Sequence, residues 1–257
     1  MFTHLVTSGC SFSDSRPTTI TWPRHLAEIL GVKLYNRAQA SVGNDWVRRT
    51  AIYQTRQLLC QGVAADSILC MVMWTGWHRL SLWVNREQTP RFTELCLANQ
   101  NPLTYWDSQP NQPWGHSSPE RGWLVGSPSC TFGGTGIQRY KTMAMAQYWP
   151  DEALAIHTLE QWQALSTWCR SEGIALGNQL WQKDSLHAEC AEWPVCQDLL
   201  AELRPQEWLG GVGQSEFTRE QCLPFEADGL HPGTRANLEW TRQKILPWLQ
   251  EHHGDRI

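Results

Sequence analysis

The stretch His4-Leu5-Val6-Thr7-Ser8-Gly9-Cys10-Ser11, close to the start of the chain, predicts the fold. Residues 5–7 form a short apolar run that favours a β-strand, and Gly9 follows almost at once. A glycine after a strand permits a sharp turn and leaves room for the residues that come next. Open α/β sheets build their sites at the carboxyl ends of such strands. Ser11 therefore lies either at such a site or in an ordinary turn, where its hydroxyl would bond the local backbone.

A second polar cluster, Asp228-Gly229-Leu230-His231-Pro232, stands near the other end of the chain, just before a helix-like segment. A histidine acts as a general base when an acceptor holds its other ring nitrogen and fixes its tautomer. Asp228 can supply that acceptor across a turn that Gly229 makes easy, and Pro232 restricts the exit of the turn. Together with a serine, this pair would complete a nucleophilic triad.

These two stretches together resemble the SGNH (GDSL-like) hydrolase family. That family has Gly-Asp-Ser after its first strand, where this chain has Gly9-Cys10-Ser11, and Asp-x-x-His-Pro before its last helix, which residues 228–232 match. The resemblance implies that Ser11 is the nucleophile, that His231 is the base and that Asp228 orients the base. It also implies a mechanism that needs no cofactor and no metal.

The resemblance further implies two loops that bind the oxyanion. A backbone N–H would come from the loop of residues 36–45, although a plain strand-to-helix loop is the alternative there. The family's asparagine after the third strand is absent, and losing one such donor costs about 3–4 kcal/mol of transition-state stabilisation. The tentative donors are Ser41, Gly43, Asn44, Thr75 and Gly76.

Hydrophobic patterning predicts strands alternating with helices along the chain. Such alternation favours a parallel, flavodoxin-like sheet in a three-layer α/β/α sandwich, with all candidate residues after strands at one edge. Asn44 or Asp45 would cap the second helix. The expected strands are residues 5–7, 32–35, 67–74, 79–85 and 174–176, and the expected helices are 24–30, 45–61, 151–172, 191–203 and 234–250, with a loop at 208–225.

We expect one domain, 1–257, that carries a polar, tryptophan-rich insertion at about 78–150. Its tryptophans, among them Trp106, Trp114 and Trp123, could form a substrate-binding lid or could anchor a long loop to the body. The second interpretation is preferred. The run 133–136 has no lysine at phosphate-loop spacing, which favours a simple turn.

Composition excludes several classes of protein. A net charge of −4 without basic blocks argues against nucleic-acid binding, and no apolar stretch reaches membrane-span length. The nine cysteines are odd in number and scattered, which predicts reduced, buried thiols in a cytoplasmic protein. No signal-peptide pattern follows Met1. His187, Cys190 and Cys196 lack the paired spacing of a zinc site.

Two functions are compatible with these features. The first is a serine esterase, acylhydrolase or O-acyltransferase acting on a small-molecule or glycan ester. The second is a non-catalytic protein of the same fold that binds a glycan or protein partner through the insertion. Retention of Ser11, Asp228 and His231 favours the enzyme, because a binding protein has no chemical need for all three. Cys10 is an alternative nucleophile, but we expect its side chain to point away from that of Ser11.

Overall fold

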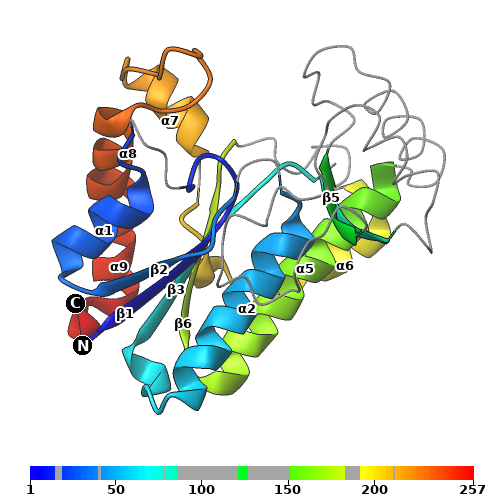
Figure 1. The fold of residues 1–257 in the computed structure, drawn as a ribbon, viewed down its shortest axis with the longest axis horizontal. Helices are drawn as coiled ribbons and strands as arrows, with labels where there is room; N and C mark the ends of the chain where they lie inside the picture. The colour runs from blue at the N-terminus through cyan, green and yellow to red at the C-terminus, as the bar shows by residue number, and fades with distance from the viewer. Residues whose placement is uncertain are drawn as a thin grey trace.

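The computed structural model describes residues 1–14, 19–39, 42–77, 79–85, 121–126, 151–182, 192–210 and 212–257, with the backbone alone at 80–85, 121–126 and 151. The main sheet has four parallel strands, in the order β2-β1-β3-β6. The strand order reverses between β1 and β3, because β2 lies on one side of β1 and β3 on the other (Figure 1). These strands are β1 (His4–Ser8), β2 (Lys33–Asn36), β3 (Ile68–Trp74) and β6 (Ala175–Leu180).

Helices cover both faces of this sheet (Figure 1). One face carries α2 (Asn44–Cys60), α5 (Asp151–Glu172) and α6 (Pro194–Ala201). The other carries α1 (Trp22–Leu30), α7 (Gln214–Glu220), α8 (Thr234–Trp240) and α9 (Leu246–His253), the last two joined by the π-helical segment η5 (Thr241–Ile245). Short 3₁₀ turns are η1 (Ala65–Ser67), η4 (Pro205–Glu207) and η6 (Gly254–Arg256). The predicted α/β class and parallel sheet are confirmed, and the arrangement is compatible with a three-layer sandwich.

Strand β3 is the centre of the core, and all of its residues are buried. Successive side chains point to opposite faces of a strand, so β3 divides its apolar residues between two clusters. Cys70 and Val72 pack with α2 and α5, whereas Leu69 and Met71 pack with α1, α8 and α9. The strand expected at 67–74 is confirmed, and its unbroken apolar sequence is typical of a strand buried on both faces.

Several predicted elements differ from the structure in extent. Strand β6 continues to Leu180, beyond the predicted end, because its backbone pairs with β3 as far as Trp74. Helix α6 begins at Pro194 and is not interrupted there, since proline is tolerated in the first turn of a helix. Helix α7 lies inside the segment 208–225 that was expected to be a loop.

The insertion is described only in two strands. β4 (Leu80–Asn85) was predicted, but β5 (Arg121–Gly126) was missed, and the two pair antiparallel. The strand-favouring run of β5, Trp123-Leu124-Val125, is short and lies between two glycines in a polar stretch, and its pairing with β4 is a non-local property. Predictions for Trp106, Trp114, the run 133–136, His187 and Cys190 lie outside the described residues.

The cysteines of the described segments are all free. Cys10, Cys70, Cys169 and Cys196 are buried, as expected. A hydrogen bond with Cys70, together with burial, holds the pKa of the Cys169 thiol above its usual value. The prediction of burial is wrong for the exposed Cys60 and Cys222.

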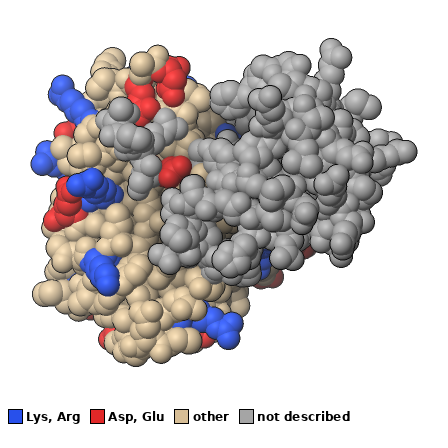
Figure 2. All heavy atoms as spheres, viewed as in Figure 1, with Lys and Arg blue, Asp and Glu red and all other residues tan. Residues whose placement is uncertain are grey.

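The surface shown in Figure 2 carries mixed charge. Basic and acidic side chains of the described residues are interspersed on this face and form no patch of one sign there. Among helices within the described segments, none combines the length and the apolar character needed to cross a membrane.

Candidate active site

Ser11 lies in a tight turn that follows β1. The Cys10 carbonyl accepts the backbone N–H of Ser13 at 2.9 Å and that of Asp14 at 3.1 Å, which closes the turn. A Cβ atom at Gly9 would lie 2.6 Å from the Ser13 Oγ and 3.0 Å from the Met73 carbonyl oxygen. Only glycine therefore lets this turn lie so close to the end of β3, as its position after the strand predicted.

The Ser11 turn is held by side chains from two other elements, one buried and one half-buried. Trp22 of α1 donates from its indole Nε1 to the Ser13 Oγ at 2.9 Å. Asn36, at the end of β2, donates from Nδ2 to the Ser13 carbonyl at 2.7 Å. Ser13 itself has no exposed surface. The nucleophile candidate is thus carried on a segment that is packed into the body of the protein.

His231 lies in a loop with its own hydrogen bonds. The Asp228 carboxylate accepts, at Oδ1, the backbone N–H of Leu230 at 2.9 Å and that of His231 at 3.0 Å. The Glu226 N–H donates to the His231 carbonyl at 2.7 Å. Gly229 takes a φ of 66°, the left-handed conformation that glycine adopts easily. Local bonds therefore set the orientation of this loop.

The structure brings the three predicted triad residues together. His231 Nε2 lies 2.8 Å from the Ser11 Oγ, and His231 Nδ1 lies 2.6 Å from Asp228 Oδ2. In the neutral histidine this geometry suits a proton on Nδ1, held by the carboxylate, and a lone pair on Nε2 that faces the serine hydroxyl. The His231 side chain is 13% exposed and that of Asp228 is 44% exposed.

The environment of Asp228 favours its ionised form. Desolvation acts to raise the pKa of Asp228, but the N–H groups of His231 and Leu230 and the His231 ring outweigh it. The pKa of this carboxyl is therefore held well below its usual value. Asp228 is consequently a carboxylate at neutral pH and can stabilise a protonated imidazole.

Asn237 of α8 connects the two loops and was not predicted from the sequence. Its buried Oδ1 accepts the Trp22 backbone N–H at 3.1 Å and the Gln214 amide at 2.9 Å. Its Nδ2 donates to the carbonyls of Pro232 at 2.9 Å and Gly233 at 3.1 Å. One side chain thus joins the start of α1 to the exit of the His231 loop. A polar residue on the buried face of the last helix was the only signal.

Asn44 is not available as an oxyanion donor. Its Oδ1 accepts the Thr75 backbone N–H at 2.9 Å, and its Nδ2 donates to the Thr75 carbonyl at 3.2 Å and to the Thr158 Oγ1 at 3.3 Å. Both amide hydrogens are used, which corrects the prediction for Asn44. Neither Asn44 nor Asp45 caps α2, because Gly43 occupies the N-cap position. The Thr75 Oγ1 is buried and meets no hydrogen-bond partner within the described residues.

Two backbone N–H groups remain near the ends of β1 and β3. Within the described segments, neither the Ser11 N–H nor the Gly76 N–H donates to an acceptor. The parallel register pairs Ser8 with Val72, so both groups follow neighbouring strands at the same edge of the sheet. Ser41 lies outside the described residues.

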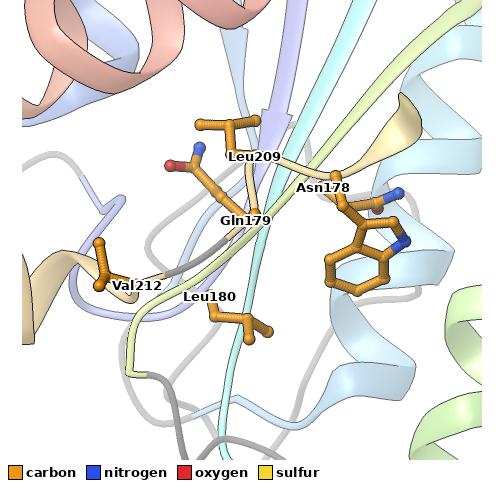
Figure 3. Close-up of a pocket in the computed structure, with 7 residues that line it drawn as sticks. Asn178, Gln179, Leu180, Leu209 and Val212 are labelled. Atoms are coloured by element: carbon orange, nitrogen blue, oxygen red, sulfur yellow. The ribbon is translucent and has the colours of Figure 1, made fainter. Parts of the chain in front are cut away.

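Two pockets lie at the carboxyl end of β6, and neither is lined by a triad residue. Figure 3 shows the smaller, a cavity of about 70 Å³ between β6 and the segment after η4. Leu180 and Trp208 line both. The larger, apolar pocket, of about 330 Å³, is lined by Trp162, Leu180, Leu200, Leu203, Pro205 and Trp208.

Glu226, Asp228 and His231 could also offer ligand atoms to a metal ion, since those atoms lie within 4.8 Å of one another. A metal there would compete for His231 Nδ1, which bonds Asp228. The geometry therefore suits a proton relay with Ser11 better than a metal centre. The alternative nucleophile, Cys10, is fully buried in the apolar cluster beside α1 and α9.

Comparison with known proteins gives no independent identification. No protein-family model matches the chain, and no curated protein is detectably similar to it in sequence. The resemblance to SGNH hydrolases stays a prediction that depends on the two motifs, and the case for catalysis depends on the geometry of the triad.

Proposed function

We propose that this protein is a serine hydrolase or O-acyltransferase of the SGNH type that acts on an ester. The observation that carries the proposal is the pair of contacts from His231, at 2.8 Å to the Ser11 Oγ and at 2.6 Å to Asp228 Oδ2. A nucleophile, a base and an orienting carboxylate in this order are the components of acyl transfer through a covalent intermediate.

The position of Ser11 supports the same proposal. It follows β1 where the strand order reverses between β1 and β3. In doubly wound sheets with the order 2-1-3, ligands bind in the crevice at this reversal, outside the carboxyl ends of the strands. The triad and the expected crevice therefore coincide.

In the proposed reaction the Ser11 Oγ attacks the ester carbonyl while His231 Nε2 takes the hydroxyl proton. The tetrahedral intermediate collapses, the bond to the leaving alcohol breaks, and His231 returns the proton to that alcohol. Water or an acceptor hydroxyl then attacks the acyl-serine with His231 again as base, which releases the acid or a new ester. Asp228 stays ionised throughout and stabilises the imidazolium.

The oxyanion would be bound by the backbone N–H groups of Ser11 and Gly76. Backbone amides serve this purpose because the negative charge needs preorganised N–H donors and not a particular side chain. The engagement of Asn44 with Thr75 removes a third donor, so we expect a modest rate constant.

The engagement of Asn44 also favours the second candidate, a non-catalytic protein of this fold that binds a glycan or a protein partner. For the enzyme, the substrate would be a small-molecule or glycan ester, and the mechanism requires no cofactor. The free cysteines of the described segments support a reducing, cytoplasmic site of action.

Labelling with a fluorophosphonate probe tests the proposal. We expect stoichiometric labelling of the native protein and its loss in Ser11→Ala and His231→Ala. Ser171→Ala is the matched control, since this exposed serine only bonds the Trp168 carbonyl of its own helix. Cys10→Ala should label normally. A folded native protein that does not label would contradict an activated Ser11 and would favour the binding protein.

A further inference from the structure

Arg79, whose side chain has no anionic partner among the described residues, packs on the ring of Trp181 just after β6. The Arg79 guanidinium carbon lies 5.5 Å from the centre of the Trp181 ring. The Arg79 Nε is shielded from solvent, yet it donates to no acceptor, and no carboxylate pairs with this side chain in the described part of the chain. The Trp181 Nε1 is shielded and unpaired in the same way.

Aromatic contacts connect this cation to the candidate active site. The Trp181 ring packs edge-on against Phe12, with centroids 5.0 Å apart, and Phe12 lies 5.1 Å from the His231 ring. The Arg79 backbone N–H bonds the Gly76 carbonyl at 3.1 Å. Arg79 therefore closes a short turn that begins at Gly76, one of the proposed oxyanion donors. Two rings, those of Trp181 and Phe12, lie between its charge and the ring of the proposed base.

The chemistry of these groups indicates their ligand. Arginine and the tryptophan indole are hydrogen-bond donors only, so neither can satisfy the other. Buried polar groups are normally paired, and an unpaired donor needs an acceptor from elsewhere. A guanidinium fork recognises carboxylates with particular strength because the bonds are charge-assisted.

We propose that the ester substrate carries a carboxylate, which Arg79 and Trp181 bind while Ser11 attacks the ester carbonyl. This inference rests on the proposed function, because it takes Ser11 as the point of reaction. Phe12 would separate the two ends of the substrate, the anionic end at Arg79 and the reacting end at His231.

Binding without turnover tests the anion site. The affinity of Ser11→Ala for p-nitrophenyl half-esters of dicarboxylic acids, from succinate to suberate, is measured by calorimetric titration. It is compared with the affinity of the same variant for p-nitrophenyl alkanoates of equal length. A second pair of esters tests a charge on the alcohol side: the acetyl ester of 4-hydroxybenzoate carries the carboxylate there, and 4-methylphenyl acetate is its neutral partner. We expect at least one anionic ester to bind about tenfold more tightly than its neutral partner, and Arg79→Gln to remove that advantage.

Two further variants control this experiment. Arg79→Lys keeps the charge without the planar fork, so it should retain part of the preference. Arg24→Gln removes an exposed arginine that pairs with Glu28 on α1, and this variant should retain the full preference for the anionic ester. If every anionic ester binds no better than its neutral partner, or if Arg79→Gln leaves the preference intact, the inference is overturned.

Turnover in the native protein separates this inference from the proposed function. If both hold, Arg79→Gln lowers the ratio of kcat/KM for the preferred anionic ester to that for its neutral partner by about tenfold. Ser11-dependent cleavage of esters without any charge preference would overturn the anion site alone. Arg79-dependent binding with neither cleavage nor fluorophosphonate labelling would overturn the proposed function alone.

Discussion

The two loops that form the triad are positioned by different means. Ser11 lies between residues that are almost completely buried, Cys10 and Phe12, and its turn is held by side chains of α1 and β2. The Asp228–His231 loop is largely exposed, and it is oriented mainly by hydrogen bonds within itself. The position of Ser11 thus depends on the packing of the whole fold, and that of Asp228 and His231 depends on a few local bonds.

This difference separates effects on stability from effects on chemistry. Changes around Ser11 should lower both the free energy of unfolding and the reactivity. Changes within the His231 loop should lower reactivity and leave the fold nearly intact. Substitutions in each loop and a change of pH test this contrast.

Asp228→Asn should cost most in reactivity and little in stability. The asparagine oxygen can still accept the N–H groups of Leu230 and His231, but its amide would face His231 Nδ1 and favour the wrong tautomer. We expect the rate of fluorophosphonate labelling to fall by about 10³–10⁴-fold, with urea unfolding nearly unchanged. A comparable loss of stability would show that the loop is packed like the Ser11 turn.

Asn237→Ala should damage both loops at once. It leaves the Trp22 N–H and the Gln214 amide without their acceptor and removes the donor to the Pro232 carbonyl. We expect a loss of about 3 kcal/mol in the free energy of unfolding, measured by urea denaturation. Asn237→Asp is the matched control, because it keeps the acceptor and should keep more of the stability. Equal losses in the two variants would be evidence against this connection.

Gly9→Ala should destabilise the body of the protein. The new methyl group would meet the Met73 carbonyl oxygen at 3.0 Å, and that atom belongs to a buried central strand. We expect a loss of about 1–3 kcal/mol in urea unfolding and a lower labelling rate, since the turn must move. Unchanged labelling would show that the turn can yield without moving Ser11.

Gly229→Ala is the counterpart in the exposed loop. Its methyl group would meet no atom within 4 Å, so the only cost is the left-handed φ of 66°. We expect about 1–2 kcal/mol from backbone strain, measured by the same unfolding experiment. A larger loss than that of Gly9→Ala would reverse the contrast between the loops.

Acidification should give the smallest effect. Because the folded-state pKa of Asp228 is lowered, its ionisation stabilises the fold at pH values above the ordinary pKa of about 3.9 and this contribution is lost as the pH falls below it. The stability difference between native protein and Asp228→Asn should therefore shrink as the pH falls below about 4. Urea titrations at several pH values around and below this point measure it, and solvent exposure of Asp228 keeps it small. A difference that grows as the pH falls below about 4 would contradict the lowered pKa.

The sequence predicted the parts of the site that depend on short-range pattern. Gly9 and Ser11 directly follow a strand, and Asp228 and His231 are joined by one turn, so neighbouring residues define each half. That the two halves meet followed from the parallel sheet, whose strands end at one edge. The helices α1, α2 and α5 were predicted nearly to their ends because their apolar periodicity is local.

The features of the site that the sequence did not predict depend on contacts between distant elements. In the sequence Asn237 is an ordinary polar residue of a helix, and its bond to the Trp22 backbone forms only where α8 packs against α1. In the same way, nothing in the sequence indicates that Asn44 bonds Thr75. The edge-on packing of Trp181 against Phe12 required β6 to extend to Leu180, which its own sequence did not indicate. Side-chain amides can bond many partners, and tertiary packing alone selects among them.

The distance along the chain between Ser11 and His231 has a consequence for biosynthesis. The 2.8 Å bond between them spans 220 residues, and its anchor, Asn237, lies in α8. A ribosome-bound chain that lacks α8 and α9 cannot close this contact, however well its first strands have formed. We therefore expect reactivity to arise only after α8 has emerged and folded, so that a chain arrested before α8 carries a serine without its base.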